Sequence, residues 1–153
     1  MTALRAFGSD REAPGRPGAP GTAPRLLFVD DEERILSALR RCLRREGYEL
    51  CFATSPAAAL RLLESQSLDL VISDQRMPGQ SGTEFLALAA QIQPAAGRLL
   101  LTGWTEEIPR AELARVGVLA LVPKPWEDAE LKRVLRDALA RAPAAHKGSG
   151  PSQ

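Results

Sequence analysis

An apolar run that ends abruptly in a carboxylate constrains this chain more than any other feature. Leu70, Val71 and Ile72 lead into Ser73 and Asp74, and a turn-prone sequence (residues 77–79, Met-Pro-Gly) follows. Apolar residues that run on without alternating with polar ones predict a strand buried on both faces. Open α/β sheets bind ligands at the carboxyl ends of such strands. We therefore expect Asp74 to be a functional residue at the edge of a parallel sheet.

Four further apolar runs occur along the chain, separated by helical patterns. We expect strands at residues 25–29, 48–53, 68–73, 98–101 and 118–122. Apolar residues at helical spacing predict helices that begin near residues 33, 56, 83, 108 and 127. This alternation predicts an α/β fold in which parallel strands are joined by right-handed crossovers, with helices on both faces of a doubly wound sheet.

Local signals mark several helix ends. Ser55 followed by Pro56 is typical of a helix start, and Gly117 is typical of a helix end. The helix that begins near Thr83 is expected to face the core with four apolar residues, Phe85, Leu86, Ala89 and Ile92.

One domain, residues 25–140, contains nearly all of this patterning. Residues 1–24 are rich in Pro and Gly and poor in large apolar side chains, which predicts a disordered arm. Residues 141–153 are expected to form a flexible tail. Because that tail is too short for a second domain, we expect any output of this domain to lie in a separate protein.

Composition argues against several classes of protein. The net charge is +1, so no global field indicates a nucleic acid or a membrane as partner. No apolar run approaches the roughly 20 residues of a membrane span, and the N-terminal segment lacks the apolar centre of a signal peptide. We expect a cytoplasmic protein that binds neither membrane nor DNA, with Cys42 and Cys51 as reduced thiols that fill the core.

Polar side chains follow four of the predicted strands. They are Asp30 and Asp31 after the first, Asp74 after the third, Thr102 after the fourth and Lys124 after the fifth. If the first and third strands are adjacent, these groups converge on one crevice. Three close carboxylates repel one another, and a divalent cation relieves that repulsion. Mg²⁺ prefers oxygen ligands, so the pattern favours a magnesium site.

Each of these residues also has an interpretation without a site. Asp30 and Asp31 are consistent with a helix N-terminus and Asp74 with a turn. Thr102 is consistent with a core hydroxyl bonded to the backbone, and Lys124 with a solvated surface lysine. The coincidence of all of them at one edge of the sheet favours the site.

Four motifs together carry a resemblance to a known family. Asp30-Asp31, Asp74 with the Met-Pro-Gly turn, Thr102-Gly103 and Lys124-Pro125 resemble the receiver domain of bacterial two-component response regulators. The resemblance covers about residues 25–140. It implies a flavodoxin-like five-stranded sheet of order 2-1-3-4-5 with five helices, and an Asp74 that takes phosphate from the phosphohistidine of a sensor histidine kinase.

The resemblance also implies roles for the other residues. Asp31 and Asp74 would bind Mg²⁺ directly, together with the backbone carbonyl of Arg76, and Asp30 would act mainly through a bound water. Thr102 and Lys124 would contact the phosphoryl group.

The chain departs from the family pattern at one informative position. Many receivers carry Tyr or Phe three residues before the lysine, where the ring moves inward on phosphorylation, and this chain has Leu121 there. Arg76 and Trp104 occupy positions that in receivers control water access to the phosphoryl group, and we expect them to shield it. Trp126 and Arg76 resemble a subgroup of receivers often joined to phosphohydrolase-like or other non-DNA-binding outputs. Trp126 either packs at the rim of the site or contributes to a partner-binding face.

The function that this resemblance implies is that of a signalling switch or relay. The chain would accept phosphate from a sensor histidine kinase or phosphotransfer protein, act on a separate output protein, and be no enzyme beyond its own phosphorylation and dephosphorylation. The alternative is a degenerate receiver that binds proteins independently of phosphorylation. A phosphohydrolase with an aspartyl nucleophile is disfavoured, because Asp30-Asp31-Glu32 does not provide the usual Asp-x-Asp pattern.

Overall fold

The computed structural model describes residues 22–103 and 107–142. Five strands form one sheet in the order β3-β2-β4-β5-β6. Their bounds are β2 (Arg25–Val29), β3 (Glu49–Ala53), β4 (Leu70–Asp74), β5 (Gly97–Gly103) and β6 (Val118–Lys124). All four neighbouring pairs are parallel. Counted along the chain this is the order 2-1-3-4-5, so the predicted flavodoxin-like fold is confirmed. Most of the predicted arm and tail, residues 1–21 and 143–153, lies outside the described residues.

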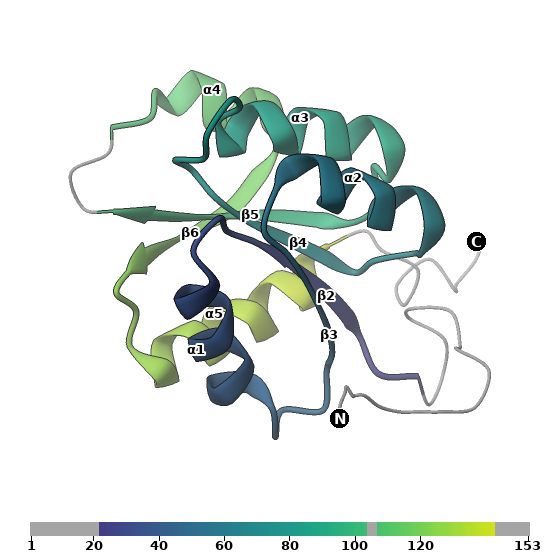
Figure 1. Ribbon diagram of the computed structural model, residues 1–153, viewed down its shortest axis with the longest axis vertical. Helices are drawn as coiled ribbons and strands as arrows, with labels where there is room; N and C mark the ends of the chain where they lie inside the picture. The colour runs from purple at the N-terminus through teal and green to yellow at the C-terminus, as the bar shows by residue number, and fades with distance from the viewer. Residues whose placement is uncertain (1–21, 104–106, 143–153) are drawn as a thin grey trace.

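Helices cover both faces of the sheet, as Figure 1 shows. Helices α1 (Glu33–Leu43) and α5 (Asp128–Arg141) lie on one face. Helices α2 (Pro56–Ser65), α3 (Gly82–Ile92) and α4 (Arg110–Val116) lie on the other. In the described part of the chain, no helix has both the length and the apolar character needed to span a bilayer.

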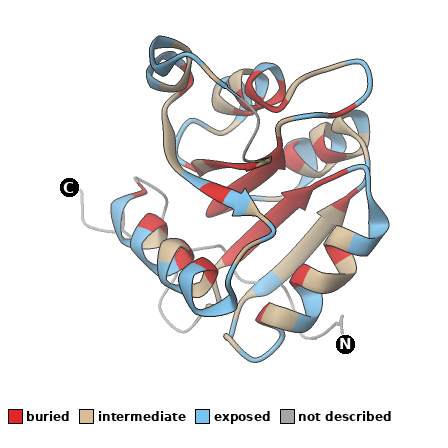
Figure 2. Cartoon of the chain, turned by 90° about the vertical axis from the view of Figure 1, so that its left-hand side faces the viewer, coloured by how far each residue is buried: buried red, intermediate tan, exposed pale blue. Residues whose placement is uncertain are grey.

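Two apolar clusters hold these layers together. One joins Phe28 and Ile72 to Leu131 of α5, and the other joins Leu27 and Val71 to Phe85 of α3. Alternate residues of the central strands enter opposite clusters, which is why these strands are apolar without interruption. Figure 2 shows the buried residues concentrated on the strands and on the inward sides of the helices.

Local chemistry fixes the helix starts next to the site edge. The Ser55 hydroxyl accepts a hydrogen bond from the backbone N–H of Ala58, and Pro56 is the first helical residue, as predicted. Ser81 and Glu84 form a capping box at the start of α3. The Ser-x-x-Glu spacing is the sequence signature of this motif, although the prediction for this helix did not use it.

Several details differ from the predictions. Asp74 is itself the last residue of β4, and β6 continues through Pro123 to Lys124. Proline is tolerated there because β6 lies at the edge of the sheet. Helix α4 begins at Arg110, because Pro109 occupies the N-cap position. Ile92, predicted to face the core, is 37% exposed, because it is the last residue of α3 and lies one turn beyond the exposed Leu88. Cys42 and Cys51 are free and only partly buried.

Candidate functional site

Three carboxylates meet at the carboxyl edge of the sheet. Val29 of β2 pairs with Ser73 of β4. The residues that follow them, Asp30 and Asp74, therefore lie side by side. One oxygen from each of Asp30, Asp31 and Asp74 lies within 4.8 Å of the others. Asp30 and Asp74 are buried, whereas Asp31 is exposed. The cluster therefore consists of two buried carboxylates and one that faces solvent.

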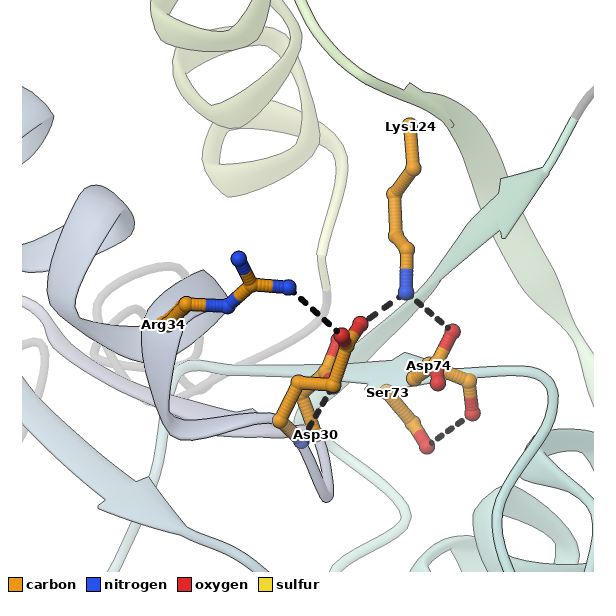
Figure 3. A network of polar contacts seen from close by, with 6 residues as sticks. Asp30, Arg34, Ser73, Asp74 and Lys124 are labelled. Carbon is orange, nitrogen blue, oxygen red and sulfur yellow. Dashed lines mark hydrogen bonds and ion pairs between the residues drawn. The ribbon is translucent and has the colours of Figure 1, made fainter.

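Lys124 joins this cluster from the end of β6. Its Nζ lies 3.0 Å from Oδ1 of Asp74 and 3.2 Å from Oδ2 of Asp30. Figure 3 shows the lysine side chain extending toward both carboxylates, with its nitrogen between Asp30 and Asp74. The ammonium group thus bridges two strand ends that are adjacent in the sheet but far apart in the sequence.

The surroundings shift the pKa of both partners. Burial, assisted by the charge of Asp74, raises the pKa of Asp30, although the backbone N–H of Glu32, 2.9 Å from Oδ1, and Lys124 act in the opposite direction. Burial alone would lower the pKa of Lys124, but its bonds and charge interactions with Asp74 and Asp30 outweigh burial and raise it. Lys124 is therefore held as an ammonium ion between the two carboxylates.

The charges of the cluster do not cancel. Three carboxylates face one ammonium group, which leaves two negative charges when all four groups are ionised. Burial is the main cause of the raised pKa of Asp30, and the negative charge of Asp74 adds to it. A hard divalent cation with oxygen ligands matches both the charge and the donor atoms, so the residues present fit Mg²⁺.

Thr102 lies at the same edge, on the strand between Asp74 and Lys124. Leu101 of β5 pairs with Asp74, and Thr102, the next residue, pairs with Pro123 of β6. Its side chain is largely buried. The structure therefore places Thr102 beside the cluster, although its role remains a prediction. Arg76 is exposed on the loop after β4.

Trp126 and Leu121, two residues singled out in the sequence near the site, lie in different environments. Trp126 is partly buried and packs against the apolar cluster that α1 and α5 share with the sheet, in keeping with the rim-packing interpretation. Leu121, at the position of the usual aromatic switch, is 45% exposed. Trp104 lies outside the described residues.

Two residues that support Asp74 did not stand out in the sequence. The hydroxyl of Ser73 donates to the backbone carbonyl of Asp74 at 2.9 Å. A Cβ atom at Gly82 would lie 2.3 Å from that same carbonyl oxygen, so the start of α3 packs directly against the backbone of Asp74. A glycine three residues beyond a turn was the only available signal, and on its own it does not reveal such a close approach.

Residues 26–136 match the protein family described as the response regulator receiver domain. Among curated relatives, the hydrogenase transcriptional regulatory protein HoxA of Bradyrhizobium diazoefficiens is 35% identical over 115 residues. That match covers 74% of this chain but only 24% of HoxA, so the chain spans about a quarter of this relative.

Two solved structures resemble the whole domain. The signal receiver domain of an HD domain-containing protein from Pseudomonas fluorescens Pf-5 is 39% identical, with a TM-score of 0.73, and the match covers 77% of this chain and 95% of that one. The CheY-like response regulator receiver domain protein from Methanospirillum hungatei JF-1 is 26% identical, with a TM-score of 0.75, and the match covers 84% and 100%.

Proposed function

This chain belongs to the response regulator receiver domain family, and on that premise we propose that it is a phosphoacceptor switch or relay of a two-component system. Asp74 would accept a phosphoryl group from a phosphohistidine of a sensor histidine kinase or phosphotransfer protein. The phosphorylated domain would then bind a separate output protein differently.

The contact of Lys124 with both Asp74 and Asp30 carries this proposal. The ammonium group lies within hydrogen-bonding distance of the proposed nucleophile, and its charge is fixed by two carboxylates. A cation held beside an acceptor carboxylate before any phosphate arrives is preorganised to stabilise negative charge during transfer.

Each residue of the site has a defined role in the proposed phosphoryl transfer. An oxygen of Asp74 forms a bond to phosphorus while the phosphorus–nitrogen bond of phosphohistidine breaks. The electron pair of the broken bond goes to the imidazole nitrogen, which takes a proton from solvent. Lys124 exchanges its contact with Asp74 for one with a phosphoryl oxygen, and the hydroxyl of Thr102 donates to another. Asp30, buried and bonded to the backbone N–H of Glu32, keeps the ammonium group in position.

The acidic cluster would hold Mg²⁺ during this reaction. Asp31 and Asp74 are the proposed direct ligands together with the backbone carbonyl of Arg76, and Asp30 acts mainly through water. When bound, the ion supplies the positive charge that the transferring phosphoryl oxygens need beyond that of Lys124.

The remaining parts of the proposal concern catalysis and partners. We propose no enzymatic activity beyond self-catalysed phosphorylation and dephosphorylation. We also propose a separate output protein, and no direct contact with DNA. HoxA, named as a transcriptional regulatory protein, is about four times longer than the match, so its name does not decide this last point.

Mass spectrometry after incubation with Mg²⁺ and acetyl phosphate tests the proposal. We expect one phosphoryl adduct per chain, on the peptide that contains Asp74. The adduct should be lost in Asp74→Asn and when EDTA replaces Mg²⁺. Asp137→Asn, an exposed carboxylate on α5, is the matched control and should be modified like the wild type.

Two results would contradict the proposal. One is the absence of an adduct both from small phosphodonors and from phosphorylated histidine kinases. The other is an adduct that persists in Asp74→Asn. Partner binding that is unchanged in Asp74→Asn would favour the phosphorylation-independent module.

A further inference from the structure

A chain of hydrogen bonds leads from the acceptor to helix α4. Gln75, the residue after Asp74, donates its backbone N–H to the carbonyl of Leu101 at 3.0 Å and accepts at its own carbonyl from Gly82 at 2.9 Å. Its side-chain oxygen accepts from the backbone N–H of Thr83 at 3.0 Å. Gln75 therefore ties the acceptor to β5 on one side and to the first turn of α3 on the other.

Thr83 continues this connection across two helices. Its side chain is almost fully buried, and its hydroxyl lies 2.5 Å from Oε2 of Glu112 in the first turn of α4. An ionised carboxylate only accepts hydrogen bonds, so the hydroxyl of Thr83 is the donor. A bond to a charged acceptor is stronger than one between neutral groups, which makes this contact a firm link between α3 and α4.

The direction of the neighbouring bonds strengthens this link. The hydroxyl of Ser81 lies 3.1 Å from that of Thr83, and it accepts from the backbone N–H of Glu84 as the N-cap of α3. Because Thr83 donates to Glu112, the hydroxyl of Ser81 must donate to Thr83. The bonds thus run in one direction from the cap of α3 to α4, an arrangement in which each bond polarises the next.

Besides the bond from Thr83, the guanidinium of Arg98 donates to the carbonyl of Val116 at 2.9 Å, and Leu113 packs against the apolar cluster that contains Phe85. Helix α4 nevertheless has few buried side chains. It contains seven residues, only Val116 among them is fully buried, and its N-cap, Pro109, offers no side-chain hydrogen bond. A short helix with few buried apolar side chains belongs to the least stable part of a fold. The bond from Thr83 therefore anchors the first turn of α4, whereas Arg98 anchors its last residue.

The aromatic side chain that moves inward in many receivers on phosphorylation is absent from this chain. Leu121, at the aromatic switch position, is exposed and has no polar group with which to report on the site. A signal from Asp74 must reach the neighbouring helices through other contacts. The connection through Gln75 and Thr83 begins at the acceptor's own peptide bond.

We propose that the hydrogen bond between Thr83 and Glu112 couples the acceptor loop, residues 75–82, to helix α4. Phosphorylation of Asp74 pulls on this loop at Gln75, weakens the bond from Thr83 to Glu112, and releases α4 from its position against α3. This inference rests on the proposed function, because it requires a phosphoryl group on Asp74. Thr83 is a positioning residue here, since it acts through Gln75 and Glu112 and does not touch the phosphoryl group.

Amide hydrogen exchange of α4, residues 110–116, tests the coupling on the full chain. In the wild type, acetyl phosphate with Mg²⁺ should speed exchange in α4 by on the order of fivefold, the lower end of typical coupling between sites. In Thr83→Val, exchange in α4 should be fast already without phosphate, and phosphate should change it less than about twofold. Thr83→Ser, which keeps the hydroxyl, should restore the wild-type response.

Three controls make the outcome decisive. The adduct on Asp74 is measured in the same samples, so that a missing adduct in the wild type counts against the proposed function and not against the coupling. Glu112→Ala should behave like Thr83→Val, and the double variant should be no worse than either single one. Glu64→Gln, an exposed carboxylate on α2, should behave like the wild type. The inference would be overturned if phosphorylation of Thr83→Val still changed amide exchange in α4 as much as in the wild type. It would also be overturned if the effects of Thr83→Val and Glu112→Ala on that exchange were additive in the double variant.

Discussion

The ammonium of Lys124 lies 3.0 Å from a carboxylate oxygen of Asp74, a residue 50 positions earlier in the chain. The same ammonium lies 3.2 Å from Asp30, so one cation is shared by the ends of two adjacent strands. This relationship brings together the two functional predictions of the sequence, an acceptor carboxylate and a phosphoryl-binding lysine. It also makes Lys124 the residue whose removal should affect both stability and transfer.

Replacing Lys124 by methionine should slow phosphorylation of Asp74. The variant keeps the apolar stem but loses the charge that stabilises the transferring group, so we expect a loss on the order of 100-fold in rate. The measurement is the rate of adduct formation with acetyl phosphate and Mg²⁺. Lys132→Met, which removes a half-exposed lysine on α5 paired with Glu46, should leave the rate unchanged. Equal rates in the two variants would contradict the role of Lys124.

Replacing Asp30 by asparagine should stabilise the metal-free protein at pH 7. The folded-state pKa of Asp30 is raised above 3.8, mainly by burial, so the folded state binds its proton more tightly than the unfolded state. The contribution of this group to stability is therefore full below about pH 4 and is lost as the pH rises through the folded pKa. Asparagine carries no charge, so the variant does not lose this stability at pH 7. Its melting temperature in EDTA should be higher than that of the wild type by on the order of 4 °C.

Mg²⁺ should stabilise the wild type more than it stabilises Asp30→Asn. A cation that binds only the folded state raises the melting temperature of the wild type, whereas Asp30→Asn should gain much less. Asp137→Asn provides the reference for an exposed carboxylate. A wild-type melting temperature that does not respond to millimolar Mg²⁺ would count against the metal site.

Replacing Gly82 by alanine should weaken the fold at the acceptor. The new methyl group would lie 2.3 Å from the carbonyl oxygen of Asp74 and 2.8 Å from Leu100, so α3 must move away from β4. Overpacking of this kind costs about 2 kcal/mol, which a urea unfolding curve detects directly. At Gly79 the added methyl group meets nothing within 4 Å, and only the backbone angle of +82° opposes it. Gly79→Ala should therefore cost about 1 kcal/mol and leave α3 in place.

Arg76 and Trp104 should slow the loss of phosphate from Asp74. Both are expected to restrict the approach of water to the phosphoryl group, so Arg76→Ala and Trp104→Ala should each shorten its lifetime. Phosphate release is followed after the phosphodonor has been removed. If both variants release phosphate at the wild-type rate, the shielding hypothesis is wrong.

Cys51 should react slowly with alkylating reagents in the folded protein. Burial raises the pKa of its thiol from 9.0 to about 11, and the thiolate is the reactive form. In a Cys42→Ser background, modification by iodoacetamide should be slow at pH 8, accelerate up to about pH 11, and become fast at pH 8 in urea. The thiol's contribution to stability is full below about pH 9 and is lost as the pH rises through about 11. Rapid modification of the folded protein at pH 8 would show that the thiol is not shielded.

The architecture and the edge at which the site lies could both be predicted from the amino-acid sequence. Uninterrupted apolar runs such as Leu70–Ile72 require burial on both faces, and their alternation with helical patterns leaves a parallel sheet as the solution. Asp30 and Asp74 were predictable for the same reason, because parallel strands bring their carboxyl ends to one edge. These are consequences of local pattern, which a single chain displays in full.

The contacts between the side chains of the site depend on the folded structure. It buries Asp30 and exposes its neighbour Asp31, and it places the ammonium of Lys124 between two carboxylates. It also leaves Ile92 exposed at the end of α3 and brings the buried hydroxyl of Thr83 against Glu112 of α4. None of these follows from spacing along the chain, because each depends on the distance between elements that are remote in sequence. Packing of the whole fold sets those distances, and with them the charges and contacts of the site.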